Sequence, residues 1–415
     1  MSDGGPDGLI EVGDHLAVVL EATPLVEAAT MPLSAARGRT LREAVTAAVD
    51  LPVFDNSAMD GFAVRFADVA SASTASPATL RVVADLPAGT ALDPALAPGE
   101  AARIMTGAPL PSDADTIVPF EDTAGGLADS LTSVVVLRAP AGSGAHVRRR
   151  GDDAAAGDPL LDPGVVLGPL QLAAVAAAGV ADVAVSRKPR VVVVSTGSEL
   201  VAPGGSLTRG QIPESNGELL AGLSAEAGAE VVLRLAVSDD GDGPREAVVA
   251  AETLGADAVV FSGGVSAGAF EVVKATLGDT MRFSRVRMQP GKPQGFGTTP
   301  SGVLLFGLPG NPVSAAVSFE VFVRPALLRM QGRRDLHRPV LRLPAATAWR
   351  TPPGRAQYLP VTIDRGDARS WRAVPVSRGA SHLAGSLGRA EAYAVVPAEI
   401  DAVAAGDLVD VMLIS

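Results

Sequence analysis

The 415-residue sequence contains no cysteine and only four histidines. The absence of cysteine excludes a disulfide framework, a thiolate nucleophile and a cysteine-ligated metal, and so few histidines argue against a His-rich zinc site. Positive charge is also scarce, because 34 Lys and Arg face 46 Asp and Glu, for a net charge of −12. Such a chain has no overall attraction for nucleic acid or for an anionic membrane surface, although a local basic site for a small anion remains possible.

Long apolar runs and targeting signals are missing as well. No apolar stretch free of Gly and charge reaches the roughly 18 residues that a membrane span needs. The N-terminal segment MSDGGPDGLIEVGDHL is polar and acidic, without the basic start and apolar core of a signal peptide. We therefore expect a cytoplasmic protein that has neither a membrane nor a nucleic acid as a partner.

The chain nevertheless has enough apolar material for several cores, since 47% of its residues are hydrophobic and 19% are charged. At about 150 residues per domain, its length predicts roughly three domains. Glycine (45 residues) and proline (32 residues) are frequent and show no period, which excludes a collagen-like chain and predicts many tight turns.

The segment 190–330 has the clearest pattern. Runs rich in Val, Leu and Ile alternate there with helix-like segments, which predicts a doubly wound, mostly parallel α/β domain. The expected strands are 191–195, 230–237, 256–262 and 303–307, with 281–288 as a possible fifth, and the expected helices are 216–227, 244–254, 270–277 and 313–330.

The flanking regions differ from this centre. Short apolar runs between Pro, Gly and Asp clusters predict an inserted β-rich domain, with strands near 80–84, 101–105, 116–120 and 133–137. Helix-like segments are expected from a cap at Asp14, after Arg39-Thr40 and around 168–172, and short β runs after about 335 predict a small all-β C-terminal domain. The predicted division is an elongated N-terminal region (1–50 with 145–187), the inserted β-rich domain (51–144), the α/β domain (188–331) and the C-terminal β domain (332–415).

Each strand candidate of the central domain ends in a loop rich in Gly, Ser or Asp, at 195–199, 238–242, 262–266, 289–293 and 307–312. In open α/β sheets, ligands bind at the carboxyl ends of the strands, where backbone N–H groups and helix N-termini can hold an anion. Asp239, Asp240 and Glu199 at this edge could hold Mg²⁺ together with a substrate phosphate. Ordinary βα turns and helix caps are the alternative interpretation of these loops.

Two other motifs have competing interpretations. The segment 264–268 (GVSAG) matches the nucleophile elbow G-x-S-x-G of serine hydrolases, with Ser266 as nucleophile and His382 downstream. Ser262 and Gly263 extend the turn where an elbow needs a strand that runs straight in, which argues against a hydrolase. The triple arginine at 148–150 is either a solvated face, a set of interdomain ion pairs or part of a site for an anionic substrate.

Nine motifs occur in a fixed order: DNSAMDGFAV (55–64), RIMTGAP (103–109), RRRGDD (148–153), VSTGSEL (194–200), SDD (238–240), SGGVSAG (262–268), QPGKPQGFG (289–297), GLPGNPVSA (307–315) and SHLAGSL (381–387). This set, which covers about residues 10 to 415, resembles the MoeA family of molybdopterin molybdenumtransferases, related to the E domain of gephyrin. The resemblance implies that adenylylated molybdopterin and molybdate give molybdenum cofactor and AMP, with Mg²⁺ assisting. It also implies a homodimer whose cleft combines the central and C-terminal domains of one subunit with the β-rich domain of the other.

The resemblance also implies roles for individual residues. Asp60, Thr106 and Lys292 would be catalytic, with Asp60 as the key carboxylate, and Mg²⁺ would be held by Asp239, Asp240 and Glu271. Lys292 and loops rich in N–H groups suit a substrate with phosphates and an oxyanion. Substrate contacts would come from Arg149, Asp153, Glu199, Ser262, Gly263, Gly264, Ser266, Lys274, Pro309, Asn311, Pro312 and Ser381.

The sequence departs from the family pattern at a few of these places. Ser198 stands where the family often has Asp, Ala269 and Glu271 replace an acidic pair, Gln289 replaces a Lys of some members, and Glu391 replaces a frequent Asn. These departures alter the expected metal ligands and some anion contacts. A tungstate-using relative or a non-catalytic scaffold are the alternatives, and the expected protein partners are a molybdopterin adenylyltransferase and molybdoenzyme chaperones.

Overall fold

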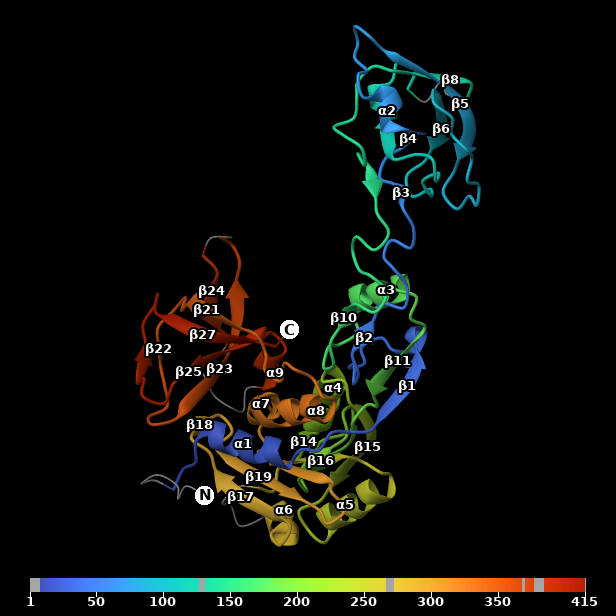
Figure 1. The fold of residues 1–415 in the computed structure, drawn as a ribbon. Helices are drawn as coiled ribbons and strands as arrows, with labels where there is room; N and C mark the ends of the chain where they lie inside the picture. Colours follow the sequence, from blue (N-terminus) through green and yellow to red (C-terminus); the bar gives the residue numbers. More distant parts are fainter. Residues whose placement is uncertain (1–7, 127–130, 266–271, 368–369, 377–383, 415) are drawn as a thin grey trace.

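The computed structural model describes residues 8–126, 131–265, 272–367, 370–376 and 384–414. Within these ranges the chain forms a central sheet, a C-terminal sheet beside it and a third sheet at the far end of an elongated stalk (Figure 1). No helix in these ranges is long and apolar enough to cross a membrane.

The central sheet confirms the predicted doubly wound, mostly parallel domain. Its first four strands are parallel, and β19 runs antiparallel to both of its neighbours, so that the edge strand β17 has the direction of the parallel strands again. The strands follow the order β15 (Glu230–Val237), β12 (Arg190–Thr196), β16 (Ala258–Ser262), β20 (Leu304–Leu308), β19 (Pro293–Thr298) and β17 (Met281–Arg285).

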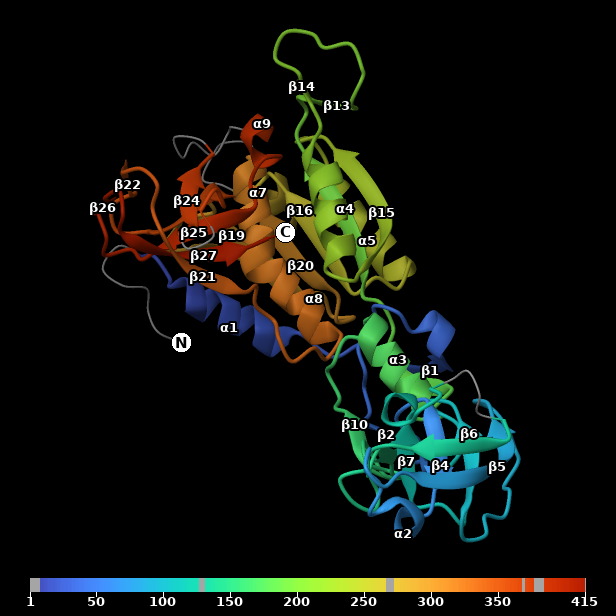
Figure 2. The same ribbon diagram turned by 90° about the horizontal axis from the view of Figure 1, so that it is seen from above.

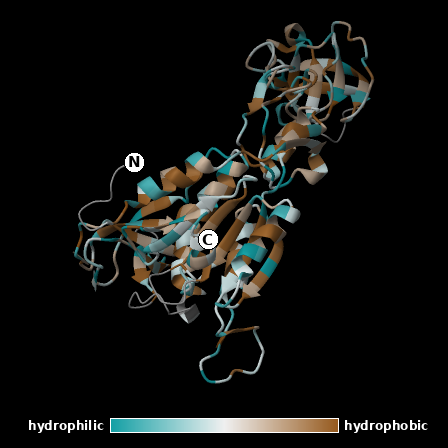
Figure 3. Cartoon of the chain, turned by 90° about the horizontal axis from the view of Figure 1, so that it is seen from below, coloured by the Kyte–Doolittle hydropathy of each residue, from teal (hydrophilic) through white to brown (hydrophobic). Residues whose placement is uncertain are grey.

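Helices cover both faces of this sheet, which explains its continuous apolar strands. Val191 and Val193 of β12 belong to one core, and Val192 and Val194 belong to the other, because successive side chains of a strand point to opposite faces. Figure 3 shows these strands as a hydrophobic centre. One face packs against α1 (Val12–Ala22), α4 (Asn216–Glu226), α7 (Pro312–Ser318) and α8 (Arg324–Met330), and the other against α5 (Gly243–Thr253) and α6 (Val272–Leu277).

The helix predicted at 313–330 is confirmed as one helical segment with an irregular middle. Its α7 and α8 parts are joined by a π-helical turn, Phe319–Val323. Glu320 in this turn is buried, and Arg338 donates to its carboxylate at 2.9 Å. The turn therefore carries a buried ion pair at the base of the C-terminal sheet.

The sheet at the end of the stalk contains all four strands predicted in the inserted region. It has the order β7 (Thr116–Pro119), β4 (Gly61–Val64), β6 (Glu100–Ile104), β5 (Ala78–Leu86) and β8 (Ser133–Val136). Residues 71–77 form a loop.

The stalk is built by the two pieces of chain that flank this sheet in sequence. β1 (Ala28–Pro32) pairs with β11 (Asp182–Ser186), β2 (Val45–Thr46) pairs with β10 (Pro159–Leu161), and α3 (Pro169–Ala177) is the helix expected near 168–172. The helix expected after Arg39-Thr40 is wrong, because Thr40 and Leu41 pair with Val166 and Val185 instead. Asp14 lies in the first turn of α1, whose N-cap is Glu11. The domain boundaries given above stay predictions.

The C-terminal sheet follows the predicted β pattern and is joined to the central domain. Its first strand, β18 (Met288–Gln289), directly precedes the loop that leads into β19. The order is β18, β23 (Ala356–Asp364), β25 (Ala392–Val396), β27 (Leu408–Leu413) and β21 (Val340–Pro344), with β24 (Arg372–Pro375) also paired to β23. Figure 2 labels β21, β24, β25 and β27 of this sheet.

The remaining elements are short. They are Leu33–Ala35, β3 (Asn56–Ser57), α2 (Phe66–Val69), Phe120–Asp122, β9 (Val147–Arg148), β13 (Leu200–Val201), β14 (Ile212–Pro213), β22 (Trp349–Arg350), α9 (Ala384–Leu387) and β26 (Ala402–Val403).

Candidate active site

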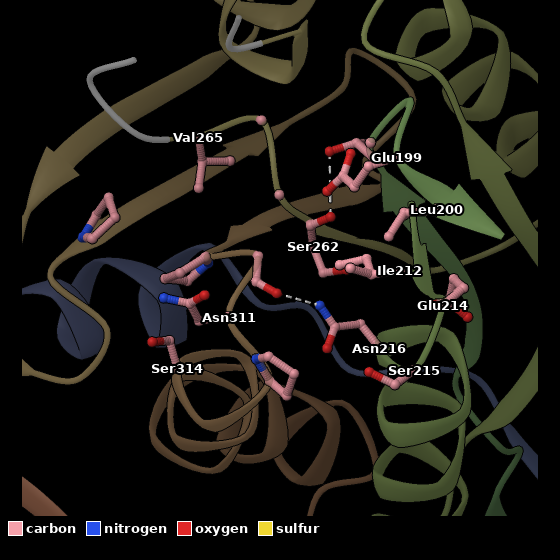
Figure 4. Close-up of a pocket in the computed structure, with 18 of the residues that line it drawn as sticks. Glu199, Leu200, Ile212, Glu214, Ser215, Asn216, Ser262, Val265, Asn311 and Ser314 are labelled. Carbon is pink, nitrogen blue, oxygen red and sulfur yellow. Dashed lines mark hydrogen bonds between the residues drawn. The ribbon is translucent and has the colours of Figure 1, made fainter. Parts of the chain in front are cut away.

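A pocket of about 720 Å³ lies at the carboxyl edge of the parallel strands (Figure 4). Residues from all five loops singled out in the sequence line it. The loop 289–293 reaches this edge although it precedes a strand, because β19 runs antiparallel to β20. The convergence of the five loops at one ligand-sized cavity is typical of ligand sites in open α/β sheets.

Glycines bring main chain to the wall of the pocket. Gly263 has a φ of 95°, and a Cβ atom there would lie 2.6 Å from Thr196 Oγ1. Gly310 faces it, since a Cβ on Gly310 would lie 3.4 Å from the Gly263 Cα. Only glycine fits the first position, and together the two leave the backbone open to a bound group.

Three carboxylates line the pocket: Glu199 and Asp239 lie in the loops after β12 and β15, and Glu214 lies between β14 and α4. Ser195 Oγ and the Gly217 N–H both donate to Glu214 Oε1, at 2.8 and 2.7 Å. Glu214 is therefore held in one orientation by donors from a strand and from the start of α4.

Asp239 is held by Ser198, one of the positions where the sequence departs from the family pattern. The Asp239 N–H donates to Ser198 Oγ at 3.0 Å, and the Ser198 N–H donates to Asp239 Oδ2 at 3.1 Å. This reciprocal pair ties the loop after β12 to the loop after β15.

The segment between β18 and β19 contributes a positive charge to the pocket. Lys292 lines the pocket and is half-buried, and no described residue forms a hydrogen bond or an ion pair with its ammonium group. Gln289 also lines the pocket, and Arg355 Nη1 donates to its Oε1 at 2.8 Å. A guanidinium group thus lies beside the position where some family members have a lysine.

The structure brings nine of the eighteen predicted site residues together at the pocket and places six others outside its lining. Asp240 and Lys274 are exposed and do not line the pocket, although Asp239, the neighbour of Asp240 in sequence, does. Ser266, Glu271 and Ser381 lie outside the described residues. The predicted residues that line the pocket are Glu199, Asp239, Ser262, Gly263, Gly264, Lys292, Pro309, Asn311 and Pro312.

Asp60, directly before β4, and Thr106, two residues after β6, meet beside the sheet at the end of the stalk, and neither lines the pocket. Asp60 Oδ1 accepts hydrogen bonds from the Thr106 N–H at 2.7 Å and from Thr106 Oγ1 at 2.8 Å. The N–H bond first, and then the hydroxyl bond, hold the pKa of Asp60 below its usual value. Gly61 is required because a Cβ atom there would overlap the carbonyl oxygen of Val118.

Arg149 and Asp153 lie where the chain returns from this sheet to the stalk. Arg149 Nη1 donates to Asp55 Oδ2 at 2.6 Å, and Arg150 pairs with Asp50. These bonds join the outgoing segment to the returning one, which is the ion-pair interpretation of the arginine run. Asp153 is exposed.

Several residues that line the pocket were not predicted from the sequence, and the polar ones Glu214 and Asn216 are among them. Both lie at the start of the predicted helix 216–227, and a carboxylate and an amide at a helix start indicate only capping. Nothing in the sequence places this helix start beside the loops that follow β16 and β20.

Comparisons with known proteins agree with this arrangement. Residues 10–179 match the MoeA N-terminal region (domain I and II), residues 192–329 match the probable molybdopterin binding domain, and residues 342–414 match the MoeA C-terminal region (domain IV). The chain is 42% identical over 403 residues to molybdopterin molybdenumtransferase 2 of Mycobacterium tuberculosis, covering 95% of this chain and 97% of that one. It is 40% identical over 313 residues to molybdopterin molybdenumtransferase of a Nostoc species, covering 74% and 70%.

Solved structures give the same result. The crystal structure of the molybdopterin biosynthesis MoeA protein from Pyrococcus horikoshii OT3 superposes with a TM-score of 0.83 at 26% identity, over 98% of this chain and 100% of that one. The ordered motifs, the three matched regions and this likeness along the whole length lead to one conclusion: the chain belongs to the MoeA family.

Proposed function

We propose that this protein is a molybdopterin molybdenumtransferase, an enzyme of molybdenum cofactor synthesis that inserts molybdate into adenylylated molybdopterin and releases AMP. The observation that carries the proposal is the pocket that is lined both by Lys292, whose ammonium group has no partner among the described residues, and by glycine-containing loops that expose their main chain. Phosphates and an oxyanion suit such a lining. The names of the M. tuberculosis and Nostoc relatives give the same reaction class.

In the proposed reaction, Mg²⁺ neutralises negative charge on the substrate phosphates. Among the described residues, no three His, Cys, Asp or Glu side chains are placed to form a metal cage. Mg²⁺ usually needs only one or two carboxylates together with waters and substrate phosphate. Glu199 and Asp239, which line the pocket from neighbouring loops, fit that requirement, whereas Asp240 would act from outside the lining.

A catalytic role for Asp60 requires a second copy of the chain. In one chain, the sheet that adjoins the Asp60–Thr106 pair lies at one end of the stalk, and the central sheet, whose strand ends form the pocket, lies at the other (Figure 1). We therefore propose a homodimer in which the β-rich sheet of one subunit completes the pocket of the other. We further propose that the protein acts in the cytoplasm. A molybdopterin adenylyltransferase would supply its substrate there, and molybdoenzyme chaperones would receive its product.

The proposal is tested by incubating the purified protein with adenylylated molybdopterin, molybdate and Mg²⁺ and measuring AMP. We expect AMP release that depends on molybdate and on Mg²⁺. Binding of the substrate without AMP release would indicate a scaffold, and release that requires tungstate in place of molybdate would indicate the tungsten-using alternative.

A further inference from the structure

One side chain connects the start of α4 to the loop that follows β20. Asn216, the first residue of α4, donates a hydrogen bond from Nδ2 to the carbonyl oxygen of Gly310 at 2.7 Å, as Figure 4 shows. The two residues are 94 positions apart in the chain. Asn216 is only 9% exposed, whereas Gly310 lies at the surface of the pocket.

The other half of the same amide group is left without a partner. Asn216 Oδ1 is buried and accepts no hydrogen bond from any described residue. An unpaired buried acceptor destabilises a folded protein. A flipped amide would place Oδ1 against the Gly310 carbonyl oxygen, so that two acceptors would face each other. The residue type and its orientation are therefore explained by the bond to Gly310.

Gly310 is a sensitive point in the pocket wall. It packs against Gly263, and the Gly263 N–H donates to the Leu308 carbonyl at 2.9 Å. A displacement of the 307–312 loop would therefore disturb the 262–265 loop as well. Both loops line the pocket, so one side-chain hydrogen bond from α4 sets the position of two parts of its wall.

We propose that Asn216 is a positioning residue for the substrate. Its Nδ2 group fixes Gly310 and thereby keeps the main chain of both loops in the arrangement that receives the anionic substrate. The inference rests on the proposed function, because it assumes that adenylylated molybdopterin occupies this pocket. Asn216 acts through Gly310 and does not need to touch the reacting atoms.

Asn216→Ala removes the donor, and the exposed Gly310 carbonyl can then bind water. We expect a folded protein in which KM for adenylylated molybdopterin rises about tenfold while kcat stays within about threefold. Amide hydrogen exchange of residues 310 and 311 should become faster without any substrate. Asn216→Asp keeps the side-chain size but turns a carboxylate oxygen toward Gly310, so its KM should rise at least as much.

Ser224→Ala is the matched control. Ser224 lies on the same helix, is fully buried, donates to the Leu220 carbonyl at 2.7 Å and does not line the pocket. This variant should lower the melting temperature and leave KM and the loop exchange unchanged.

The inference is wrong if Asn216→Ala behaves like this control, with a lower melting temperature, an unchanged KM and unchanged exchange in the loop. If Asn216→Ala does not fold, Asn216→Asp gives the same two readouts. A wild-type protein that releases no AMP would contradict the proposed function instead, and the exchange measurement would still decide whether Asn216 holds the loop.

Discussion

At the scale of single residues, Asp60 is the group whose chemistry the structure describes most closely. Its carboxylate receives two hydrogen bonds from Thr106, and these favour the ionised form. Because the pKa of Asp60 is lowered in the folded protein, its carboxylate is charged at any pH above the ordinary Asp range. It takes up a proton only when the pH falls through this lowered pKa. Any charge-dependent role of Asp60 is therefore available throughout the neutral range.

Asp60→Asn tests that role because it keeps the size of the side chain and removes its charge. We expect a folded protein that binds substrate but releases AMP at least about 100-fold more slowly, a loss of about 3 kcal/mol of transition-state stabilisation. Between about pH 6 and 8, the rates of the variant and of the wild type should depend on pH in the same way, because Asp60 is ionised throughout this range in the wild type. Near-normal turnover with a lowered melting temperature would mean that Asp60 only stabilises the loop.

His15 gives a prediction about stability. It is 5% exposed on α1, and its ring meets Phe322 edge to face with 4.7 Å between centroids. Burial lowers the pKa of His15 to about 4. The folded state therefore stays neutral at pH 5 while the unfolded state, with a pKa near 6.5, takes up a proton, so stability falls as the pH drops below about 6.5.

Denaturant unfolding at pH 7 and pH 5 measures this effect. His15 should account for a loss of about 2 kcal/mol in unfolding free energy between the two pH values. His15→Phe, which keeps an aromatic ring beside Phe322, should show a pH dependence smaller by that amount. Equal pH dependence in both proteins would contradict the assignment.

At the scale of elements, continuous apolar runs predicted the buried strands well, because a strand covered on both faces needs apolar residues throughout. β19 was missed because its sequence, PQGFGT, contains two glycines that indicate a loop. The structure explains Gly297, where a Cβ atom would overlap the Thr280 carbonyl oxygen. The helix expected after Thr40 failed because pairing with distant segments overrode the local preference.

The candidate site, too, could be predicted from the sequence only in part. The sequence located the five loops because strand ends are visible in the residue pattern, and the pocket lies where they meet. It could not locate Glu214 and Asn216, because their contacts with Ser195 and Gly310 span 19 and 94 positions of the chain and are made only in the folded protein. The substrate role predicted for Arg149 is untested, but its side chain already forms an ion pair with Asp55.

The acidic loop after β15 gives a prediction at this scale. Asp239 lines the pocket and is oriented by Ser198, whereas Asp240 is exposed beside it. Asp239→Asn should raise the Mg²⁺ concentration needed for half-maximal AMP release about tenfold, and Asp240→Asn should raise it less. Binding of Mn²⁺, followed by electron paramagnetic resonance, should weaken in the same order. An unchanged Mg²⁺ titration in both variants would remove the metal assignment from this loop.

At the scale of the whole molecule, the elongated shape separates the two halves of the proposed chemistry. The pocket with Lys292 lies at the central sheet, and the Asp60–Thr106 pair adjoins the β-rich sheet. The stalk separates these two sheets (Figures 1 and 2). The stalk is braced by β-pairing and by the Arg149–Asp55 ion pair, so bending it back onto its own pocket would break these contacts. A site shared between two copies avoids that cost.

The most direct test of this account combines two inactive variants, Asp60→Asn and Lys292→Ala. Each alone should release almost no AMP, because every pocket lacks one of the two groups. After unfolding and refolding together in equal amounts, half of the dimers should be mixed, and each mixed dimer has one complete pocket, so about a quarter of the wild-type activity should return. If the mixture stays as inactive as either variant while mixed dimers are shown to form, the site is not shared and the account is wrong.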